Sequence, residues 1–395
     1  MHDLVLTGAR LGDGRQNAWL SIANGRIAAI GDDSPPAART QISLEGDLVL
    51  PALTDAHLHL DKTLFGTPWL PHAAGPTRMS RIETDATVLP SLPRSTCDRA
   101  GALIRRCVAH GTGHLRTHVD ITTAFGLKAL EGVLEAKAAH AGACTVQTVA
   151  FPQAGVMRSR GAVELLDAAM RAGADLVGGI DPCEVDRDPK GQLDAVFAIA
   201  SRHGVGIDIH LHEPGEMGLF SLQEICARTR AIGLQGRVAV SHGFCLGGVA
   251  ESKQKSAAEM MAEAGVTLVT HGAGGSTLPP IALLRGEGVS VICGNDDIRD
   301  TWSPYGTADM LERAAVIGWR ADFRTDETLE ALFEMISIDG ARALGIAEHG
   351  VAPGLPANLF TLPAEGVPEA IGQHPQRRMV IFGGRIVARD GIYLG

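Results

Sequence analysis

The sequence of 395 residues lacks any apolar run that approaches the roughly 20 residues needed to span a bilayer. Its first residues, Met1 to Leu6, lack the basic and long apolar segments of a signal peptide. Positive charge is also in deficit, because 35 Lys and Arg stand against 45 Asp and Glu, a formal charge of −10. A polyanionic partner needs a basic face, so we expect no nucleic-acid partner and no membrane attachment.

The seven cysteines form no C-x-x-C pair and are scattered along the chain. An odd, unpatterned set is typical of reduced thiols, so we expect a cytoplasmic protein without a disulfide framework. Hydrophobic residues make up 45% of the chain and charged residues 20%, which predicts a globular protein with a substantial core. The length allows one large domain with an appendage, or two ordinary domains.

Apolar strands recur from residue 53 onward, and helical segments such as 124–140, 161–172 and 219–233 lie between them. We place these strands near residues 53–59, 114–119, 145–151, 175–180, 205–210, 237–242, 266–271 and 289–294. Eight βα units predict an α/β protein with a (β/α)8 TIM barrel. No Gly-rich dinucleotide loop follows the first strand, which disfavours a doubly wound open sheet, the competing architecture.

Both ends of the chain have β character. Residues 3–50 contain short apolar strands with a turn signal at Asn24-Gly25, and residues 351–391 again show short strands and glycine-containing turns. We therefore predict a small composite β-sandwich domain of residues 1–51 and 352–395, with the catalytic barrel of residues 52–351 inserted between them. No low-complexity linker separates the two parts, so we expect a packed junction.

Histidines gather at the carboxyl ends of the predicted barrel strands, where TIM barrels carry their active sites. His57 and His59 stand two residues apart, so in a strand they project from one face. The other polar residues at these ends are His118, His210, His242, His271 and Asn295-Asp296-Asp297. A single histidine at a strand end is usually an ordinary polar residue, but so many on one rim indicate a metal site.

The set offers ligands for one divalent metal ion, namely His57, His59, His210 and Asp296. Imidazole and carboxylate ligands suit Zn²⁺ or Fe²⁺ and do not distinguish between them. Such an ion lowers the pKa of a bound water to roughly 7. The fourth strand runs into Asp181 without the lysine that commonly bridges two ions in hydrolases of this architecture. We therefore predict one ion per subunit.

Three residues are candidates for catalysis. Glu213 follows His210 by three residues, and a carboxyl beside the metal can move a proton from water to a ring nitrogen or leaving group. His242 is a candidate hydrogen-bond donor to the hydroxide or the developing oxyanion. Asp296 can bind the metal and also accept the proton of water.

These motifs resemble the amidohydrolase superfamily and, within it, the cytosine deaminase group. The likeness rests on His57-Leu58-His59-Leu60-Asp61, on residues 114–120 and 151–155, on Ile207-Asp208-Ile209-His210 with Glu213, on Val240-Ser241-His242 and on residues 296–308. The motifs run in the family's order over nearly the whole barrel. The resemblance implies the same metal ligands, with Glu213 as proton shuttle and with His242 and Asp296 activating water.

By the same likeness, Gln153 hydrogen-bonds the amide-like edge of a heterocycle, Trp302 and Phe151 wall the ring, and Asp297 lies near the substrate. Read from the residues alone, Trp302 and Phe151 are also compatible with core at the barrel rim, and Asp297 with a helix N-cap. The chain departs from the group at Asn295, where histidine is usual, and in the glycine-rich loop 271–280. The resemblance therefore extends to the reaction chemistry of the cytosine deaminase group, but it does not extend to cytosine as the substrate.

The leading hypothesis is a metal-dependent hydrolytic deaminase that releases ammonia from an amino-substituted N-heterocycle such as a pyrimidine, pterin, purine or triazine. The second is an amidohydrolase that cleaves a cyclic amide or an N-alkylamino group on a heterocycle. The third is a non-catalytic ligand-binding relic. Glu213 favours the first, because protonation of a ring nitrogen needs a carboxyl beside the metal. A homo-oligomer is compatible with the barrel, but no interface signature stands out.

Overall fold

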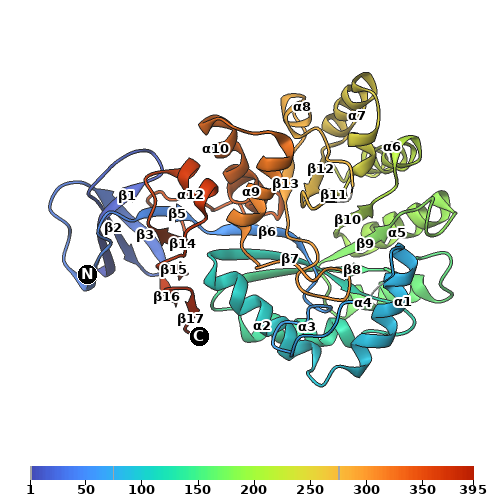
Figure 1. The fold of residues 1–395 in the computed structure, drawn as a ribbon, viewed down its shortest axis with the longest axis horizontal. Helices are drawn as coiled ribbons and strands as arrows, with labels where there is room; N and C mark the ends of the chain where they lie inside the picture. Colours follow the sequence, from blue (N-terminus) through green and yellow to red (C-terminus); the bar gives the residue numbers. More distant parts are fainter. Residues whose placement is uncertain (1, 74, 275) are drawn as a thin grey trace.

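Two sheets organise the protein in the computed structural model, which describes residues 2–73, 75–274 and 276–395 (Figure 1). One sheet has eight strands and forms a nearly closed barrel, and the other has nine strands drawn from both ends of the chain. Met1 of the predicted terminal domain and Gly275 of the glycine-rich loop lie outside the described residues. The boundaries at 51/52 and 351/352 stay a prediction.

The barrel strands pair in parallel and in chain order from β6 to β13. They are β6 (Leu53–Leu58), β7 (Thr112–Asp120), β8 (Thr145–Phe151), β9 (Leu176–Ile180), β10 (Gly206–Leu211), β11 (Val238–His242), β12 (Val266–Thr270) and β13 (Val291–Cys293). Every residue of β6, β7, β11 and β12 is buried, as expected for parallel strands covered on both faces. The predicted (β/α)8 barrel is confirmed, and each strand lies within a few residues of its predicted place.

Helices surround the barrel in Figure 1. They are α1 (Arg78–Val88), α2 (Thr96–Ala109), α3 (Lys128–Ala139), α4 (Ala162–Arg171), α5 (Pro189–His203), α6 (Gly215–Ala231), α7 (Glu251–Ala264), α8 (Ile281–Gly286), α9 (Met310–Ala321), α10 (Asp326–Met335) and α11 (Ile338–Ala343), with 3-10 turns η1 (Leu89–Ser91) and η2 (Phe244–Gly248). The three helices expected near 124–140, 161–172 and 219–233 are α3, α4 and α6. None of the helices in the described ranges has the length and apolar character to cross a membrane.

The barrel closes between β13 and β6, directly beneath the predicted metal ligands. The backbone N–H of Asp296 donates to the carbonyl of His57 at 2.7 Å. Gly294 makes this approach possible, because a Cβ there would lie 2.5 Å from the backbone nitrogen of His57. Asn295 adds a side-chain link, since its Nδ2 donates to Oδ2 of Asp55 at 2.7 Å. The Asn295 amide therefore holds the closing segment against β6.

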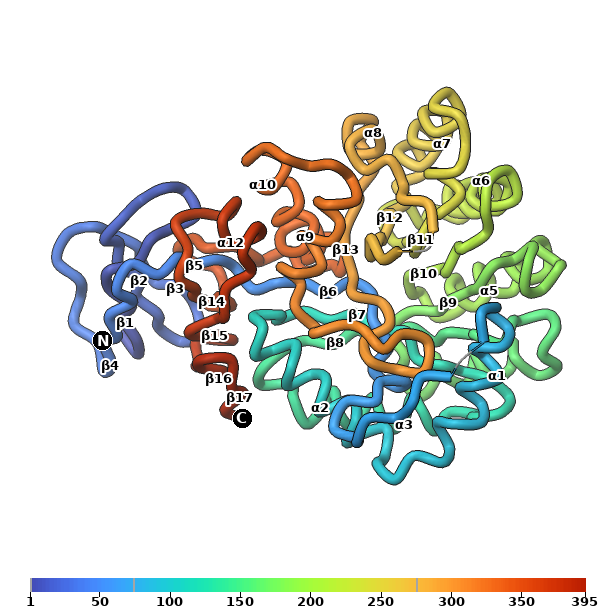
Figure 2. The backbone as a smooth tube through the Cα atoms, in the orientation of Figure 1, coloured from blue at the N-terminus to red at the C-terminus, as the bar shows by residue number. Residues whose placement is uncertain are grey.

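The second sheet joins the two ends of the chain, as Figure 2 shows in blue and red. Its strands are β1 (His2–Leu11), β2 (Ala18–Ala23), β3 (Arg26–Gly31), β4 (Ala38–Ser43), β5 (Leu48–Pro51), β14 (Leu359–Leu362), β15 (Met379–Phe382), β16 (Arg385–Arg389) and β17 (Ile392–Tyr393). Antiparallel pairing of β5 with β14 connects the halves. The predicted turn between β2 and β3 is confirmed, because Asn24 and Gly25 both have positive φ. Helix α12 (Val367–Gln373) lies between β14 and β15.

The junction between sheet and barrel is packed, as expected. Leu50 of β5 and Phe360 of β14 belong to the same buried cluster as the barrel helices and strands. A buried ion pair reinforces this contact, because Nη1 of Arg377 donates to Oδ2 of Asp309 at 2.9 Å. Asp309 caps the start of α9, so the carboxy-terminal segment is tied directly to the barrel.

Candidate active site

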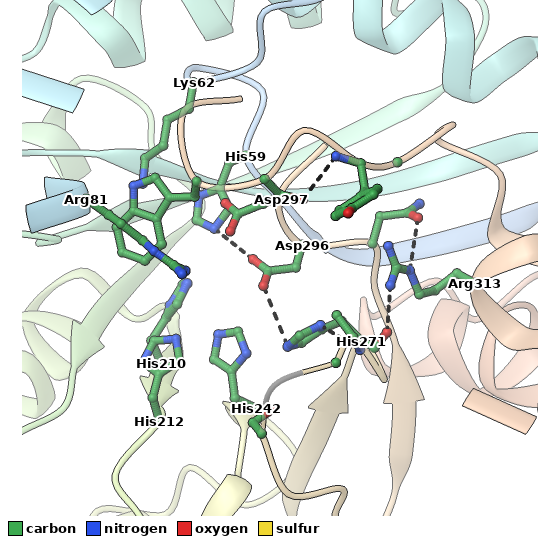
Figure 3. A pocket seen from close by; sticks show the side chains of 18 of the residues that line it. His59, Lys62, Arg81, His210, His212, His242, His271, Asp296, Asp297 and Arg313 are labelled. Atoms are coloured by element: carbon green, nitrogen blue, oxygen red, sulfur yellow. Dashed lines mark hydrogen bonds and ion pairs between the residues drawn. The ribbon is translucent and has the colours of Figure 1, made fainter. Parts of the chain in front are cut away.

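Three histidines and one aspartate meet at the carboxyl end of the barrel. His57 lies in β6, His59 follows it, His210 lies in β10 and Asp296 follows β13. The Nε2 atoms of His57 and His59 each lie 3.4 Å from Oδ1 of Asp296, and the rings of His57 and His210 are 4.6 Å apart. The structure therefore brings together the four predicted metal ligands, and Figure 3 shows His59, His210 and Asp296 converging.

Unpartnered nitrogens indicate what this cluster can hold. Within the described part of the chain, Nε2 of His57 and both ring nitrogens of His210 have no hydrogen-bond partner. A buried polar atom left unsatisfied costs about 1–3 kcal/mol, and a divalent ion would satisfy these atoms. Burial lowers the pKa of His59 to about 3 and that of His210 well below its usual value. Neutral imidazole is the form that binds a metal, so the donor set fits one.

A hydrogen-bonded relay fixes the tautomer of His57. The hydroxyl of Ser241 donates to Oδ1 of Asp208 at 2.8 Å, and it lies 2.8 Å from Nδ1 of His57. Because its single proton goes to Asp208, the hydroxyl must accept from Nδ1–H of His57, which leaves the lone pair on Nε2 for a metal. Nδ1 of His59 lies 3.2 Å from the carbonyl oxygen of His118. Such outer contacts orient metal-binding imidazoles.

His242 faces the same cluster from the end of β11. Its ring centroid lies 5.0 Å from those of His57 and His210, and neither of its nitrogens has a hydrogen-bond partner among the described residues. His242 and Asp296 both have a left-handed backbone, with φ of 76° and 62°. Non-glycine residues rarely adopt this conformation, and where they do the strain often marks a functional site.

His271 restrains Asp296 from the other side. Its Nδ1 accepts a hydrogen bond from the backbone N–H of Ala273 at 3.1 Å, so the neutral ring carries its proton on Nε2. Nε2 lies 3.6 Å from Oδ2 of Asp296 (Figure 3). The carboxylate is thus held with Oδ1 toward His57 and His59 and Oδ2 toward His271.

A cavity of about 770 Å³ opens beside these side chains, and it is lined by all four predicted substrate contacts. Phe151 stacks on the ring of His210 with centroids 3.9 Å apart. Trp302 and Gln153 lie on the same wall, where Nε1 of Trp302 and Nε2 of Gln153 both donate to Asp85. Burial, together with the charges of Asp296 and Asp300, raises the pKa of Asp297 well above its usual value. The roles of these four residues stay predictions.

Residues 72–388 match the sequence model of the amidohydrolase family, which covers most of the chain. The chain belongs to the amidohydrolase family. A curated relative, N-isopropylammelide isopropyl amidohydrolase of Pseudomonas sp. (strain ADP), is 32% identical over 398 residues, 99% of this chain and 98% of that one. Enzymes of this family hydrolyse carbon–nitrogen bonds, so the chain is a hydrolase and the non-catalytic alternative is set aside.

Solved structures agree with this assignment. N-isopropylammelide isopropylaminohydrolase from Burkholderia multivorans superposes with a TM-score of 0.95 at 40% identity over 100% of both chains. The 5-methylcytosine deaminase of Klebsiella pneumoniae, liganded with 5-fluorocytosine, reaches 0.85 at 25% identity and covers 98% of this chain and 97% of that one. The predicted cytosine deaminase-like neighbourhood within the amidohydrolase superfamily is confirmed.

The Glu213 carboxylate of this amidohydrolase is engaged by protein hydrogen-bond donors. It is buried, and its Oε1 accepts hydrogen bonds from the backbone N–H groups of Cys183 and Glu184 at 2.6 and 2.9 Å. Its Oε2 accepts from the hydroxyl of Ser221 at 2.5 Å. Burial raises the pKa of the carboxyl, although these donors oppose the rise. Glu213 is not among the residues that line the cavity, and its predicted role as proton shuttle stays a prediction.

His212 takes the cavity-facing position beside Glu213. Its ring stacks on His242 with centroids 4.0 Å apart, and its Nδ1 lies 2.8 Å from Oδ2 of Asp181. Burial would raise the pKa of Asp181, but His212 and Arg78 outweigh it, and the net shift is downward. Asp181 is thereby engaged by His212 and Arg78. The signal for His212 was its two-residue spacing from His210, the same spacing that marks His57 and His59.

Sequence reasoning also missed Lys62 and Asp85. Lys62 is buried three residues after His59, and its Nζ donates to Oε1 of Gln153. Asp85 lies 3.8 Å from the same ammonium group. Both ends of the Gln153 amide are therefore occupied by protein groups, because Nε2 donates to Asp85 at 2.8 Å. The position of Lys62 directly after the His57–Asp61 motif could have identified it, but Asp85 had no comparable signal.

Proposed function

We propose that this amidohydrolase removes an exocyclic amino group from an N-heterocycle by hydrolysis. The observation that carries the proposal is the convergence of His57, His59, His210 and Asp296 at a cavity that is also lined by Phe151 and Trp302. A heterocycle with its amidine edge at these four side chains and its flat ring against the aromatic side chains fits this arrangement. The relatives act, by their names, on ammelide, cytosine and pterin rings.

The proposal assigns the metal to these four ligands as a single Zn²⁺ or Fe²⁺ ion per subunit, since imidazole and carboxylate suit both. When bound, such an ion acts as a Lewis acid and lowers the pKa of water to roughly 7. The chain's own groups then complete the chemistry. Oδ2 of Asp296, held by His271, accepts the proton of the attacking water, and His242 donates a hydrogen bond to the oxygen on which charge develops.

Two residues compete for protonation of the leaving amine. Glu213 was predicted for it, and His212 faces the cavity with Asp181 behind it. We expect His212→Gln to lower kcat by about 10²–10⁴-fold, the range of general acid–base catalysis, while metal content is unchanged. Glu213→Gln should lower it by less, because its carboxylate is engaged with backbone N–H groups. Amine release measured at several pH values gives kcat for both variants, and metal analysis shows whether each still binds its ion. The comparison shows which substitution lowers kcat more. A reversed order would restore Glu213 as the shuttle.

The leaving group separates two candidate activities. Ammonia is the expected product, and release of an alkylamine is the second candidate, favoured by the two relatives named for isopropylammelide. We expect metal-loaded protein to release amine from at least one compound of a panel of aminopyrimidines, pterins, purines, aminotriazines and their N-isopropyl derivatives. Mass spectrometry identifies the amine and the oxo product. Opening of a lactam without amine release would contradict the proposal. Compartment and subunit assembly stay predictions.

A further inference from the structure

Helix α1 lies at the mouth of the cavity and is attached to the barrel by polar groups. Asp85 is the one fully buried residue among Arg78–Val88, and it has no exposed surface. The helix begins with a capping box formed by Thr77 and Ser80. A surface helix normally packs through an apolar stripe. Here Met79 and Ile82 are only partly buried and the fully buried side chain is a carboxylate, so the position of α1 depends on what that carboxylate binds.

Asp85 is bound from three sides. Nε2 of Gln153 and Nε1 of Trp302 donate to Oδ2 at 2.8 and 2.7 Å, and the hydroxyl of Thr301 donates to Oδ1. Lys62 supplies the balancing positive charge at 3.8 Å. Three of these four partners also line the cavity. The contact therefore fixes α1 against the wall that receives the substrate.

The start of α1 is anchored as well. Arg78 lines the cavity, and its Nη1 lies 2.8 Å from Oε2 of Glu184 and 3.2 Å from Oδ2 of Asp181. Residues 78, 81 and 85 follow the i, i+3, i+7 spacing of a single helix face. Arg81 therefore lies between two fixed points, and its position is set by contacts that do not involve its own guanidinium.

On this helix face, Arg78 is paired with carboxylates, whereas Arg81 has no carboxylate partner among the described residues. It lines the cavity, and its guanidinium lies 5.9 Å from the centre of the Trp302 indole. Its hydrogen bond, from Nε to the carbonyl oxygen of Gly75, is long at 3.5 Å. Among the described residues no carboxylate forms an ion pair with it, in contrast to Lys62 and Arg78. Figure 3 shows its guanidinium directed toward His210.

We propose that Arg81 binds a carboxylate substituent on the heterocycle, so that the substrate class of this site is an acidic N-heterocycle. The inference rests on the proposed function, whose substrate it narrows. A planar guanidinium matches a carboxylate with two parallel hydrogen bonds. The Gln153 amide is not available to bind the substrate carboxylate, because Lys62 and Asp85 already occupy its two ends. The cavity of about 770 Å³ is large enough for a ring that carries a substituent.

Calorimetric titration of the metal-loaded protein tests this with three ligands that share one non-reacting ring: uracil, uracil-5-carboxylate and uracil-6-carboxylate. We expect one of the two acids to bind at least about tenfold more tightly than uracil, as for one charge-assisted contact. Arg81→Met should remove this preference and leave the affinity for uracil within about twofold. Arg389→Met, which removes an exposed arginine of β16, should keep it.

The outcomes separate the possible roles of Arg81. Absence of any preference for an acid, binding of none of the three ligands, or a preference that survives in Arg81→Met overturns the inference. If Arg81→Met weakens the binding of uracil and of both acids equally, Arg81 only supports the Trp302 indole. That result would also overturn the inference. Release of amine from the panel together with any of these results leaves the proposed function intact. An Arg81-dependent preference without amine release from any compound would overturn the function alone.

Discussion

Replacement of His210 by alanine is expected to remove the bound metal and to lower kcat/KM by roughly 10³-fold or more, because a bound ion supplies several kcal/mol of transition-state stabilisation. The His210 side chain is buried, and neither of its ring nitrogens has a hydrogen-bond partner among the described residues. Elemental analysis of the purified variant measures the metal, and amine release measures activity. Circular dichroism and the thermal midpoint show whether the barrel has folded. Undiminished metal in folded protein would refute the assignment.

Two further variants calibrate this result. His72→Ala removes an exposed histidine outside the cavity and should keep both metal and activity. Ser241→Ala removes the hydroxyl between His57 and Asp208 and should weaken metal binding by about 10–100-fold without abolishing it, the usual effect of losing an outer-shell partner. A graded series from His72 through Ser241 to His210 would show that the loss follows distance from the ion.

Replacement of Arg377 by methionine is expected to destabilise the fold by about 3–5 kcal/mol, the range for breaking a buried ion pair on one side. The Arg377 side chain has no exposed surface and binds Asp309 with both terminal nitrogens. Its removal leaves the carboxylate of Asp309 buried, with His110 at 3.4 Å as the remaining ion-pair partner. Urea unfolding measures the change. Arg378→Met, a half-exposed neighbour paired with Asp47 at 3.4 Å, should cost no more than about 1 kcal/mol.

The same pair predicts a dependence on pH. Burial would raise the pKa of Asp309, but Arg377 and His110 outweigh it and lower the pKa to about 2. Because the folded value lies below the ordinary value of 3.8, the pair contributes stability above pH 4 and loses it as the pH falls toward 2. The difference in unfolding free energy between wild type and Arg377→Met should therefore shrink by about 2 kcal/mol over that window. A constant difference would contradict the assigned pair.

The barrel could be predicted because each of its strands is an apolar run that ends in a polar residue, a pattern set by burial on both faces and function at one end. Helix α1 could not be predicted in the same way. Its single fully buried residue is Asp85, whereas Met79 and Ile82, which stand at helical spacing, are only partly buried. Strand β4 was missed for a similar reason, because most of its side chains are exposed.

The convergence of His57, His59, His210 and Asp296 could be predicted because their spacing and their strand ends are local features. The hydrogen-bond partners of Gln153 could not be predicted, because they are Lys62 and Asp85, which lie 91 and 68 residues away in the chain. The same limit applies to Glu213 and His212. Both follow His210 within three residues, and the sequence does not show which one turns toward the cavity and which one binds Cys183 and Ser221.

The pairing of β5 with β14 has a consequence for how the protein is made. On a ribosome, β1–β5 emerge about 300 residues before the partner of β5 is synthesised. At the usual rate of 5–20 residues per second, that edge waits on the order of tens of seconds. During this interval the unpaired strand edge can pair with another chain and lead to aggregation. Nascent chains arrested before β14 should therefore bind chaperones through residues 48–51, and release should follow once residues 359–362 have emerged from the ribosome.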